Sequence, residues 1–219
     1  MSTESGLADF RSKEGMWKNV DPRQMASLRA LNANTKDFYE FYRMRVKLLR
    51  EAAPHNGHDI LANWEKRNII RHIITQNVDG FHHKAGNQAV SELHGSLRLS
   101  RCQDCKREYD IENMMNGDVP KCEACSGKLR PGVVLFGENL PMDALEEAER
   151  QSFNSDLFIV IGSSLEVSPA NYFPVKAKNA GALLVIINME ETHLDDLADL
   201  VIRGKAKEVL EDLDQSMMA

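Results

Sequence analysis

The chain has 219 residues, enough for one large domain or for one domain with a small insertion. Lys and Arg number 27 against 33 Asp and Glu, so the net charge is −6 and composition argues against non-specific nucleic-acid binding. Hydrophobic residues make up 42% and charged residues 27%, which argues against disorder. We expect a cytoplasmic protein without membrane contact, because no apolar run approaches the roughly 18 residues of a membrane span and the N-terminus does not resemble a signal peptide.

Helical and strand patterns alternate along the chain. The expected helices cover residues 34–52, 58–66, 142–152 and 172–179, and the expected buried strands cover 68–75, 156–161 and 182–187. Continuous apolar strands separated by helices are typical of a parallel sheet that is covered on both faces. The sequence therefore predicts an α/β fold.

Polar residues follow each predicted strand. They are Gln76, Asn77 and Asp79 after the first strand, Gly162, Ser163 and Ser164 after the second, and Asn188 and Glu190 at the end of the third. Ligands of parallel sheets bind at the carboxyl ends of strands, where backbone N–H groups, hydroxyls and carboxylates can hold phosphate or ribose oxygens. Ordinary Gly-Ser and Asx turns have the same composition, so each run alone leaves both interpretations open.

The four cysteines form two CxxC pairs, Cys102 with Cys105 and Cys122 with Cys125, separated by sixteen residues. Disulfides rarely persist in a reducing compartment, and this spacing fits a zinc ribbon. We predict a closed Zn(Cys)4 site that is structural rather than catalytic and that holds an inserted module over about residues 100–129. The alternative is free cysteines packed as small apolar residues.

His94 lies in a short apolar stretch directly before the cysteine module. The chain has 7 histidines, and a single histidine is more often structural than catalytic. His94 therefore becomes a catalytic candidate only together with the motifs around it.

Several longer motifs occur in a fixed order along the chain. They are STESGLADFR (2–11), TQNVDGFHHKAG (75–86), ELHGSL (92–97), the two CxxC pairs, RPGVVLFGENLP (130–141), GSSLEVSPA (162–170) and IN (187–188). This combination resembles the sirtuins, the NAD-dependent protein lysine deacylases, over nearly the whole chain. The resemblance is close to the bacterial protein deacetylases.

The resemblance implies a single sirtuin-type domain over residues 1–219. Its Rossmann-like parts would cover about 1–33, 68–99 and 130–219, its helical part 34–67 and its zinc-ribbon module 100–129. NAD and an acylated-lysine protein or peptide would meet in a cleft between the parts. The oligomeric state stays open.

The resemblance also assigns residues to ligands. Gln76, Val78 and Asp79 would border the nicotinamide and its ribose, with Asn77 beside them. The remaining cofactor residues would be Thr3, Phe10 and Arg11 in a cofactor loop, Gly162, Ser163, Ser164 and Asn188 on the phosphate and adenosine side, and Lys205 and Ala206 near the adenine. Val134, Phe136 and Gly137 would line the acyl-lysine tunnel, and Val167 would pair with the substrate backbone as an added strand.

His94 gains a role from this chemistry. In sirtuin-like reactions the acyl oxygen attacks the anomeric carbon and expels nicotinamide, and a ribose hydroxyl must then lose a proton to attack the imidate. A neutral imidazole, with a reference pKa of about 6.5, is suited to take that proton. The products would be free lysine, nicotinamide and 2′-O-acyl-ADP-ribose.

The sequence departs from the family pattern in its first motif. The family opens with a buried strand and a Gly-Ala-Gly turn, whereas this chain starts just after that point, has Ala8 in place of the usual proline, and has Ser163 where threonine is frequent. We therefore expect residues 1–219 to bind NAD poorly. A catalytically weak, zinc-stabilised peptide-binding paralogue and an ADP-ribosyltransferase remain alternatives to the deacylase.

Tyr42 and Arg45 share a face of the predicted helix over 34–52. They resemble the Tyr-x-x-Arg of sirtuins that accept acidic acyl groups such as succinyl, because a guanidinium can hold a carboxylate through two hydrogen bonds. Since Arg43, Lys47 and Arg50 are on the same helix, Arg45 could equally belong to a solvated basic face. Deacetylation remains the expected activity.

Overall fold

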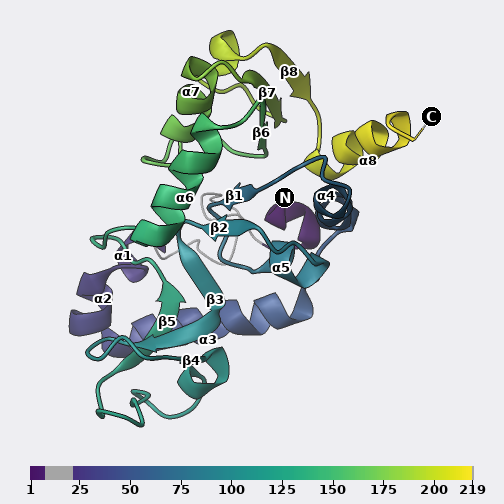
Figure 1. Ribbon diagram of the computed structural model, residues 1–219. Helices are drawn as coiled ribbons and strands as arrows, with labels where there is room; N and C mark the ends of the chain where they lie inside the picture. The colour runs from purple at the N-terminus through teal and green to yellow at the C-terminus, as the bar shows by residue number, and fades with distance from the viewer. Residues whose placement is uncertain (8–21, 219) are drawn as a thin grey trace.

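The computed structural model describes residues 1–7 and 22–218. Its N-terminal half contains η1 (Ser2–Ser5), α1 (Pro22–Met25), α2 (Leu28–Ala33), α3 (Thr35–Glu51), α4 (Asn56–Lys66), β1 (Ile73–Thr75), α5 (Phe81–Ala85), β2 (Val90–Glu92), β3 (Gly95–Cys102), β4 (Glu108–Asp110) and η2 (Ile111–Met114). The rest contains β5 (Leu129–Val133), α6 (Met142–Phe153), β6 (Leu157–Ile161), α7 (Tyr172–Asn179), β7 (Leu183–Asn188), η3 (Asp195–Leu197), β8 (Leu200–Arg203) and α8 (Ala206–Ser216). Every predicted helix and strand is present, although some bounds differ (Figure 1).

The parallel strands form two separate sheets. One pairs β1 with β2, and the other has the order β6-β7-β8. Helices α4 and α8 contribute the apolar cluster on one face, and α6 and α7 contribute the cluster on the other. These layers confirm the predicted α/β class.

A gap separates β1 from β6. Consecutive residues of both strands, 73–75 and 157–161, line the same cavity. Successive side chains of a strand point to opposite faces of its sheet. Since consecutive residues of both strands line the cavity, it is the edges of the strands that face the gap. The edges of β1 and β6 that face each other are therefore unpaired within the described residues.

Strand β1 is shorter than the predicted strand over 68–75. The backbone N–H groups of Ile69 and Ile70 donate to the Trp64 carbonyl at 2.8 and 3.4 Å, and Asn68 adopts a left-handed conformation with φ 58°. These bonds satisfy the Trp64 carbonyl in the last turn of α4. The first part of the apolar run thus ends a helix, and only its last residues form the strand.

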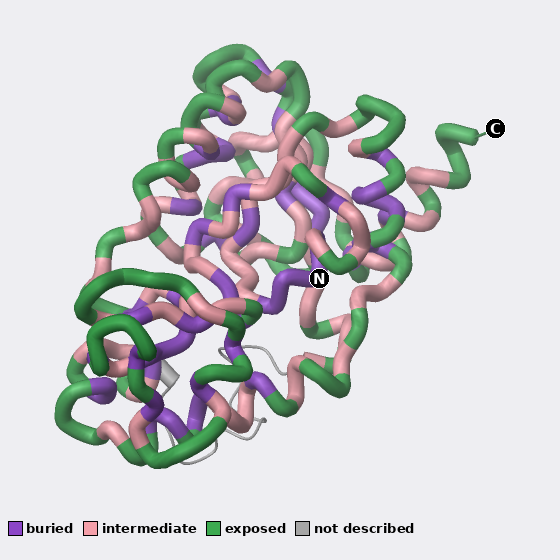
Figure 2. The backbone as a smooth tube through the Cα atoms, turned by 60° about the horizontal axis from the view of Figure 1, so that its bottom comes forward, coloured by how far each residue is buried: buried purple, intermediate pink, exposed green. Residues whose placement is uncertain are grey.

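The cysteine module is built on the antiparallel sheet β4-β3-β5. This sheet lies at the lower end of the molecule in Figure 1, and α3 crosses behind it. Phe38, Tyr39 and Tyr42 of α3 are fully buried in the cluster next to the sheet, and the Tyr39 hydroxyl donates to the Leu129 carbonyl at 2.6 Å. Figure 2 shows buried residues in the interior and exposed residues along the outer helices and loops.

Within the described residues, no helix is both long and apolar enough to cross a bilayer.

Candidate active site and metal centre

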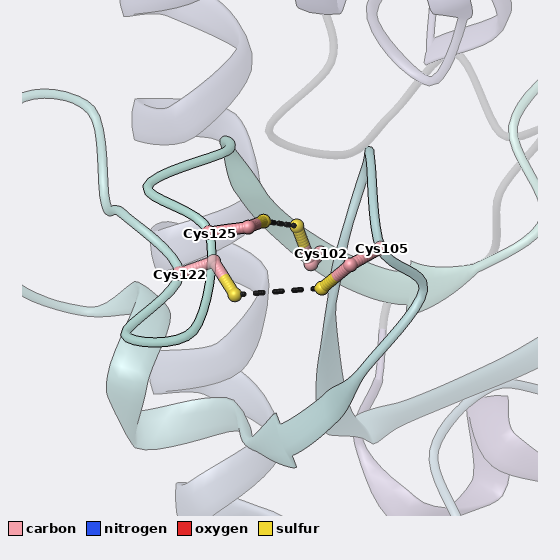
Figure 3. A group of neighbouring side chains, drawn as sticks. All are labelled: Cys102, Cys105, Cys122 and Cys125. Atoms are coloured by element: carbon pink, nitrogen blue, oxygen red, sulfur yellow. Dashed lines mark hydrogen bonds between the residues drawn. The ribbon is translucent and has the colours of Figure 1, made fainter.

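The four cysteines converge at one end of the module (Figure 3). Their sulfur atoms all lie within 4.8 Å of one another, with 3.5 Å between Cys102 and Cys125 and 3.7 Å between Cys105 and Cys122. Four thiolates around zinc at about 2.3 Å are about 3.8 Å apart, so these distances fit a tetrahedral site. All four ligand positions come from protein, which leaves no open position for a substrate or a catalytic water.

The two CxxC turns have the same backbone form. The Cys102 N–H donates to the Arg107 carbonyl at 2.9 Å, and the Cys122 N–H donates to the Gly127 carbonyl at 2.8 Å, five residues ahead in both cases. The residue after each second cysteine, Lys106 and Ser126, adopts a positive φ. Each pair is therefore fixed by its own local turn.

A cavity of about 1720 Å³ opens between the parallel strands and the antiparallel sheet. It is lined by all of the candidate ligand and catalytic residues that the structure describes: Thr3, Tyr42, Arg45, Gln76, Asn77, Val78, Asp79, His94, Val134, Phe136, Gly137, Gly162, Ser163, Ser164, Val167, Asn188, Lys205 and Ala206. Phe10 and Arg11 lie outside the described residues, as does Ala8. The cavity brings together groups that are up to two hundred positions apart in the chain.

Strand ends deliver the polar groups to this cavity. Gln76 and Asp79 follow β1, Ser163 follows β6 and Asn188 ends β7. Gly162 has a φ of 61°, which turns the chain at the end of β6, and a side chain there would lie 3.2 Å from the Met1 backbone nitrogen. The turn therefore favours glycine at this position.

Asp79 is buried and held in place from two sides. One carboxylate oxygen accepts the Phe81 backbone N–H at 2.9 Å at the start of α5. The other accepts a short hydrogen bond from the Ser2 hydroxyl. Sequence reasoning did not single out Ser2, because 77 positions separate it from Asp79 and no local pattern connects the two.

His94 is oriented by the strand end that carries Gln76. Its Nδ1 lies 3.0 Å from the Gln76 carbonyl oxygen. Because a carbonyl can only accept, Nδ1 carries the proton and Nε2 is the basic nitrogen. Burial lowers the pKa of His94 below its usual 6.5, although the bond to Gln76 acts in the opposite direction. The imidazole is thus neutral at physiological pH.

The backbone beside His94 is closely packed. Gly95 has a φ of 68°, and an added Cβ would lie 2.2 Å from the Gly132 carbonyl oxygen, so only glycine fits between β3 and β5. The Val134 N–H donates to the His94 carbonyl at 2.8 Å. The loop after β5 is therefore attached to the residue that carries the imidazole.

Arg45 lies at the cavity, whereas Arg43 lies on the other side of α3. The Arg43 side chain donates to the carbonyls of Met114, Asn116 and Gly117. The Arg45 guanidinium lies 5.7 Å from the Phe41 ring centre and 5.6 Å from that of Tyr42. Burial lowers the pKa of Arg45 and raises the pKa of Tyr42 to about 12. Arg45 is thus partly buried and lines the cavity.

The sequence profile of the Sir2 family matches residues 1–169 of the chain. An NAD-dependent protein deacetylase 1 from Geobacillus kaustophilus is 52% identical over 219 residues, covering 99% of this chain and 90% of that protein. A second NAD-dependent protein deacetylase, from Halalkalibacterium halodurans, is 50% identical over 94% of this chain and 86% of its own length.

The chain belongs to the Sir2 family.

Solved Sir2 structures have the same fold. A Sir2 homolog–NAD complex superposes with a TM-score of 0.94 at 38% identity, covering 99% of this chain and 85% of that one. A Sir2–p53 peptide–NAD+ complex gives a TM-score of 0.88 at 35% identity, with 100% and 90% covered. The Sir2 fold predicted from the motifs is therefore confirmed.

Proposed function

We propose that this protein is an NAD-dependent protein lysine deacetylase that transfers the acyl group of an acylated lysine to ADP-ribose. The observation that carries the proposal is the neutral His94, oriented by the Gln76 carbonyl in the cavity where the strand ends converge. The names of the two bacterial relatives, which are half identical to this chain, support the same activity.

The polar strand ends hold the dinucleotide in this proposal. Gln76, Asn77, Val78 and Asp79 border the nicotinamide and its ribose. The other end of the dinucleotide lies along Gly162, Ser163, Ser164, Asn188, Lys205 and Ala206, and Thr3, Phe10 and Arg11 belong to the cofactor loop. The fixed carboxylate of Asp79 is suited to accept hydrogen bonds without first having to be ordered.

The acylated lysine enters past the loop after β5. Val134, Phe136 and Gly137 line its tunnel, and Val167 pairs with the backbone of the substrate. The Phe136 side chain is half exposed at 50%, which suits a group that becomes covered when a peptide binds. The partners are therefore acylated-lysine proteins and peptides.

His94 removes a proton from a ribose hydroxyl through Nε2. NAD supplies the electrophilic anomeric carbon and the nicotinamide leaving group. The burial that keeps the imidazole neutral leaves it able to accept a proton at physiological pH. The Gln76 carbonyl then stabilises the resulting imidazolium, because it accepts from Nδ1 in both protonation states.

Zinc is held by Cys102, Cys105, Cys122 and Cys125. The sulfur distances fit the metal, and the closed donor set gives it a structural role. Placement in the cytoplasm and independence from nucleic acid and membranes stay predictions of composition.

Nicotinamide release tests the activity. The full-length protein should release nicotinamide from NAD only when an acetyl-lysine peptide is present. Release without the peptide would favour the ADP-ribosyltransferase, and peptide binding without release would favour the binding module.

A second activity on acidic acyl groups follows from Arg45. Its guanidinium lies beside Tyr42 at the cavity, where it can hold a terminal carboxylate such as that of succinyl-lysine. Arg45→Met should lower desuccinylation much more than deacetylation. Lys47→Met, on an exposed position of the same helix, is the control. Equal effects of Arg45→Met on both reactions would assign Arg45 to stability alone.

A further inference from the structure

The loop Val134–Glu138 carries three of the residues assigned to the acyl-lysine tunnel, yet it forms neither helix nor strand. Its backbone is fixed at two points by neighbouring segments. The Val134 N–H donates to the His94 carbonyl at 2.8 Å, and the Phe136 N–H donates to the Ala26 carbonyl at 2.8 Å. Side-chain contacts of Glu138 add to these backbone bonds.

The side chain of Glu138 bonds to the backbone of its own loop. One oxygen of its carboxylate accepts the Leu135 backbone N–H at 2.8 Å, and the Glu138 N–H donates back to the Leu135 carbonyl at 2.9 Å. The same carboxylate accepts from Arg130, in a short contact, and from Arg101 at 3.2 Å. The carboxylate therefore ties the turn around Phe136 and Gly137 to β3 and β5.

Arg130 is buried, with 2% of its surface exposed. Its Nη1 donates to the Val133 carbonyl at 2.9 Å, directly before the loop, and its Nη2 donates to Glu138 at the end of the loop. Arg130 thus spans the loop from start to end. A buried guanidinium needs an anionic partner, and removing that partner leaves an uncompensated charge.

The third partner, Arg101, is the neighbour of the zinc ligand Cys102. Arg101 lies opposite Arg130 in the β3–β5 ladder, and Cys102 lies opposite Leu129. The carboxylate of Glu138 therefore contacts the strand that ends in a metal ligand. One acidic side chain thus contacts both the tunnel loop and the strand that carries Cys102.

We propose that Glu138 is a positioning residue that, through Arg130 and Arg101, holds the tunnel loop in the shape that binds the acylated lysine. The proposal rests on the deacetylase function, because that function assigns Val134, Phe136 and Gly137 to the substrate. Glu138 acts on the peptide side of the cavity, so its loss affects binding of the peptide and leaves NAD binding unchanged.

Glu138→Gln tests this role, since glutamine keeps the shape but cannot neutralise Arg130. The KM for an acetyl-lysine peptide should rise by about tenfold to 100-fold, because small misplacements of binding groups have costs of this order. The KM for NAD and the zinc content should stay within about twofold. Glu112→Gln is the matched control, because Glu112 forms an exposed ion pair with Arg50 beside the same module.

An unchanged peptide KM in folded, zinc-loaded Glu138→Gln would overturn the proposal, and so would an equal rise in both KM values. If this variant does not fold, Arg101→Met decides, because it removes one contact without leaving a buried charge unpaired. It should raise the peptide KM several-fold, and no rise would overturn the proposal. Unaltered protein without peptide-dependent nicotinamide release would instead refute the deacetylase function itself.

Discussion

The cysteine module and the cavity bring their functional groups together in different ways. In the module, two short turns each fix a pair of cysteines, and the sulfur atoms of the two pairs lie within 4.8 Å of one another. In the cavity, single residues arrive from the ends of strands and from loops across the whole chain. The module is closed around its metal, whereas the cavity is open and its parallel strands form two sheets with a gap between them.

This difference separates what holds the fold from what performs the reaction. A metal site made of local pairs has its ligands in place once the turns have formed. The free energy of metal binding then adds directly to the free energy of folding. A cavity made of strand ends depends on the whole α/β layer. Substituting its polar groups should change the reaction rate more than the free energy of unfolding.

The largest effect is expected at the metal. Cys122→Ser removes a buried ligand and leaves an incomplete donor set. The variant should lose its zinc and fold poorly, so that no activity is recovered. Elemental analysis and circular dichroism measure both outcomes. A zinc-free, reduced chain with an unchanged unfolding temperature would show that the module folds without metal.

The second effect is expected at His94. His94→Ala should lower kcat by about 100-fold to 10,000-fold, the usual contribution of a general base. Zinc content and unfolding temperature should barely change, because His94 is only partly buried and, among the described residues, its ring hydrogen-bonds to the Gln76 carbonyl alone. A variant of the full-length protein that deacetylates at the normal rate would make His94 structural.

These two sites also show what the sequence alone can predict. The zinc site follows from spacing, because CxxC pairs are local and their chemistry needs no further context. The strand ends could be placed at one edge because parallel strands share their direction. The antiparallel sheet, by contrast, spans Gly95–Val133, beyond the segment expected for the module, because the β3–β5 ladder extends on either side of the cysteines.

Contacts between side chains that are far apart in the sequence cannot be predicted from it. The bond between Ser2 and Asp79 and the contacts of Glu138 with Arg130 and Arg101 depend on three-dimensional packing. The left-handed turn at Asn68 shortens β1, but it lies at the start of an apolar run whose pattern predicts a strand. The sequence therefore does not reveal the turn. The sequence likewise could not show that Arg43 contacts the Met114 carbonyl whereas Arg45 lies beside Tyr42. These contacts depend on how the cysteine module packs against α3.

Acid should destabilise the helices around the cavity through two buried histidines. Burial lowers the pKa of His58 to about 3 and that of His82 to about 4, and one ring nitrogen of each has no partner among the described residues. The unfolded chain protonates these groups near pH 6.5, whereas the folded chain does so only near pH 3 to 4. Stability is therefore fully present above pH 6.5 and falls as the pH decreases below it.

Each histidine contributes a slope of about 1 kcal/mol per pH unit in this range. Urea unfolding between pH 7 and pH 5 measures it, followed by tryptophan fluorescence, to which Trp64, buried in α4, contributes. His58→Gln should reduce the slope, and His193→Gln, at an exposed position, should not. Equal slopes in both variants would mean that His58 is protonated in the folded protein.

The smallest effect concerns the gap between the parallel sheets. Strand β7 is paired on both sides, whereas β1 and β6 each have one unpaired edge within the described residues. Amide hydrogens of β1 and β6 should therefore exchange faster than those of β7 in residues 1–219, and those of β3, which is also paired on both sides, should be protected. Equal protection of β6 and β7 would show that the gap is closed in solution.

The fate of the acyl group tests the central claim most directly. The full-length protein is incubated with NAD and a peptide whose lysine carries an isotope-labelled acetyl group, and the products are identified by mass spectrometry. The account predicts that nicotinamide, free lysine peptide and labelled O-acetyl-ADP-ribose form in equal amounts, and that His94→Ala suppresses the free lysine peptide and the O-acetyl-ADP-ribose, the two products that form after nicotinamide has left. Labelled free acetate as the primary product, or ADP-ribose attached to the peptide, would contradict it.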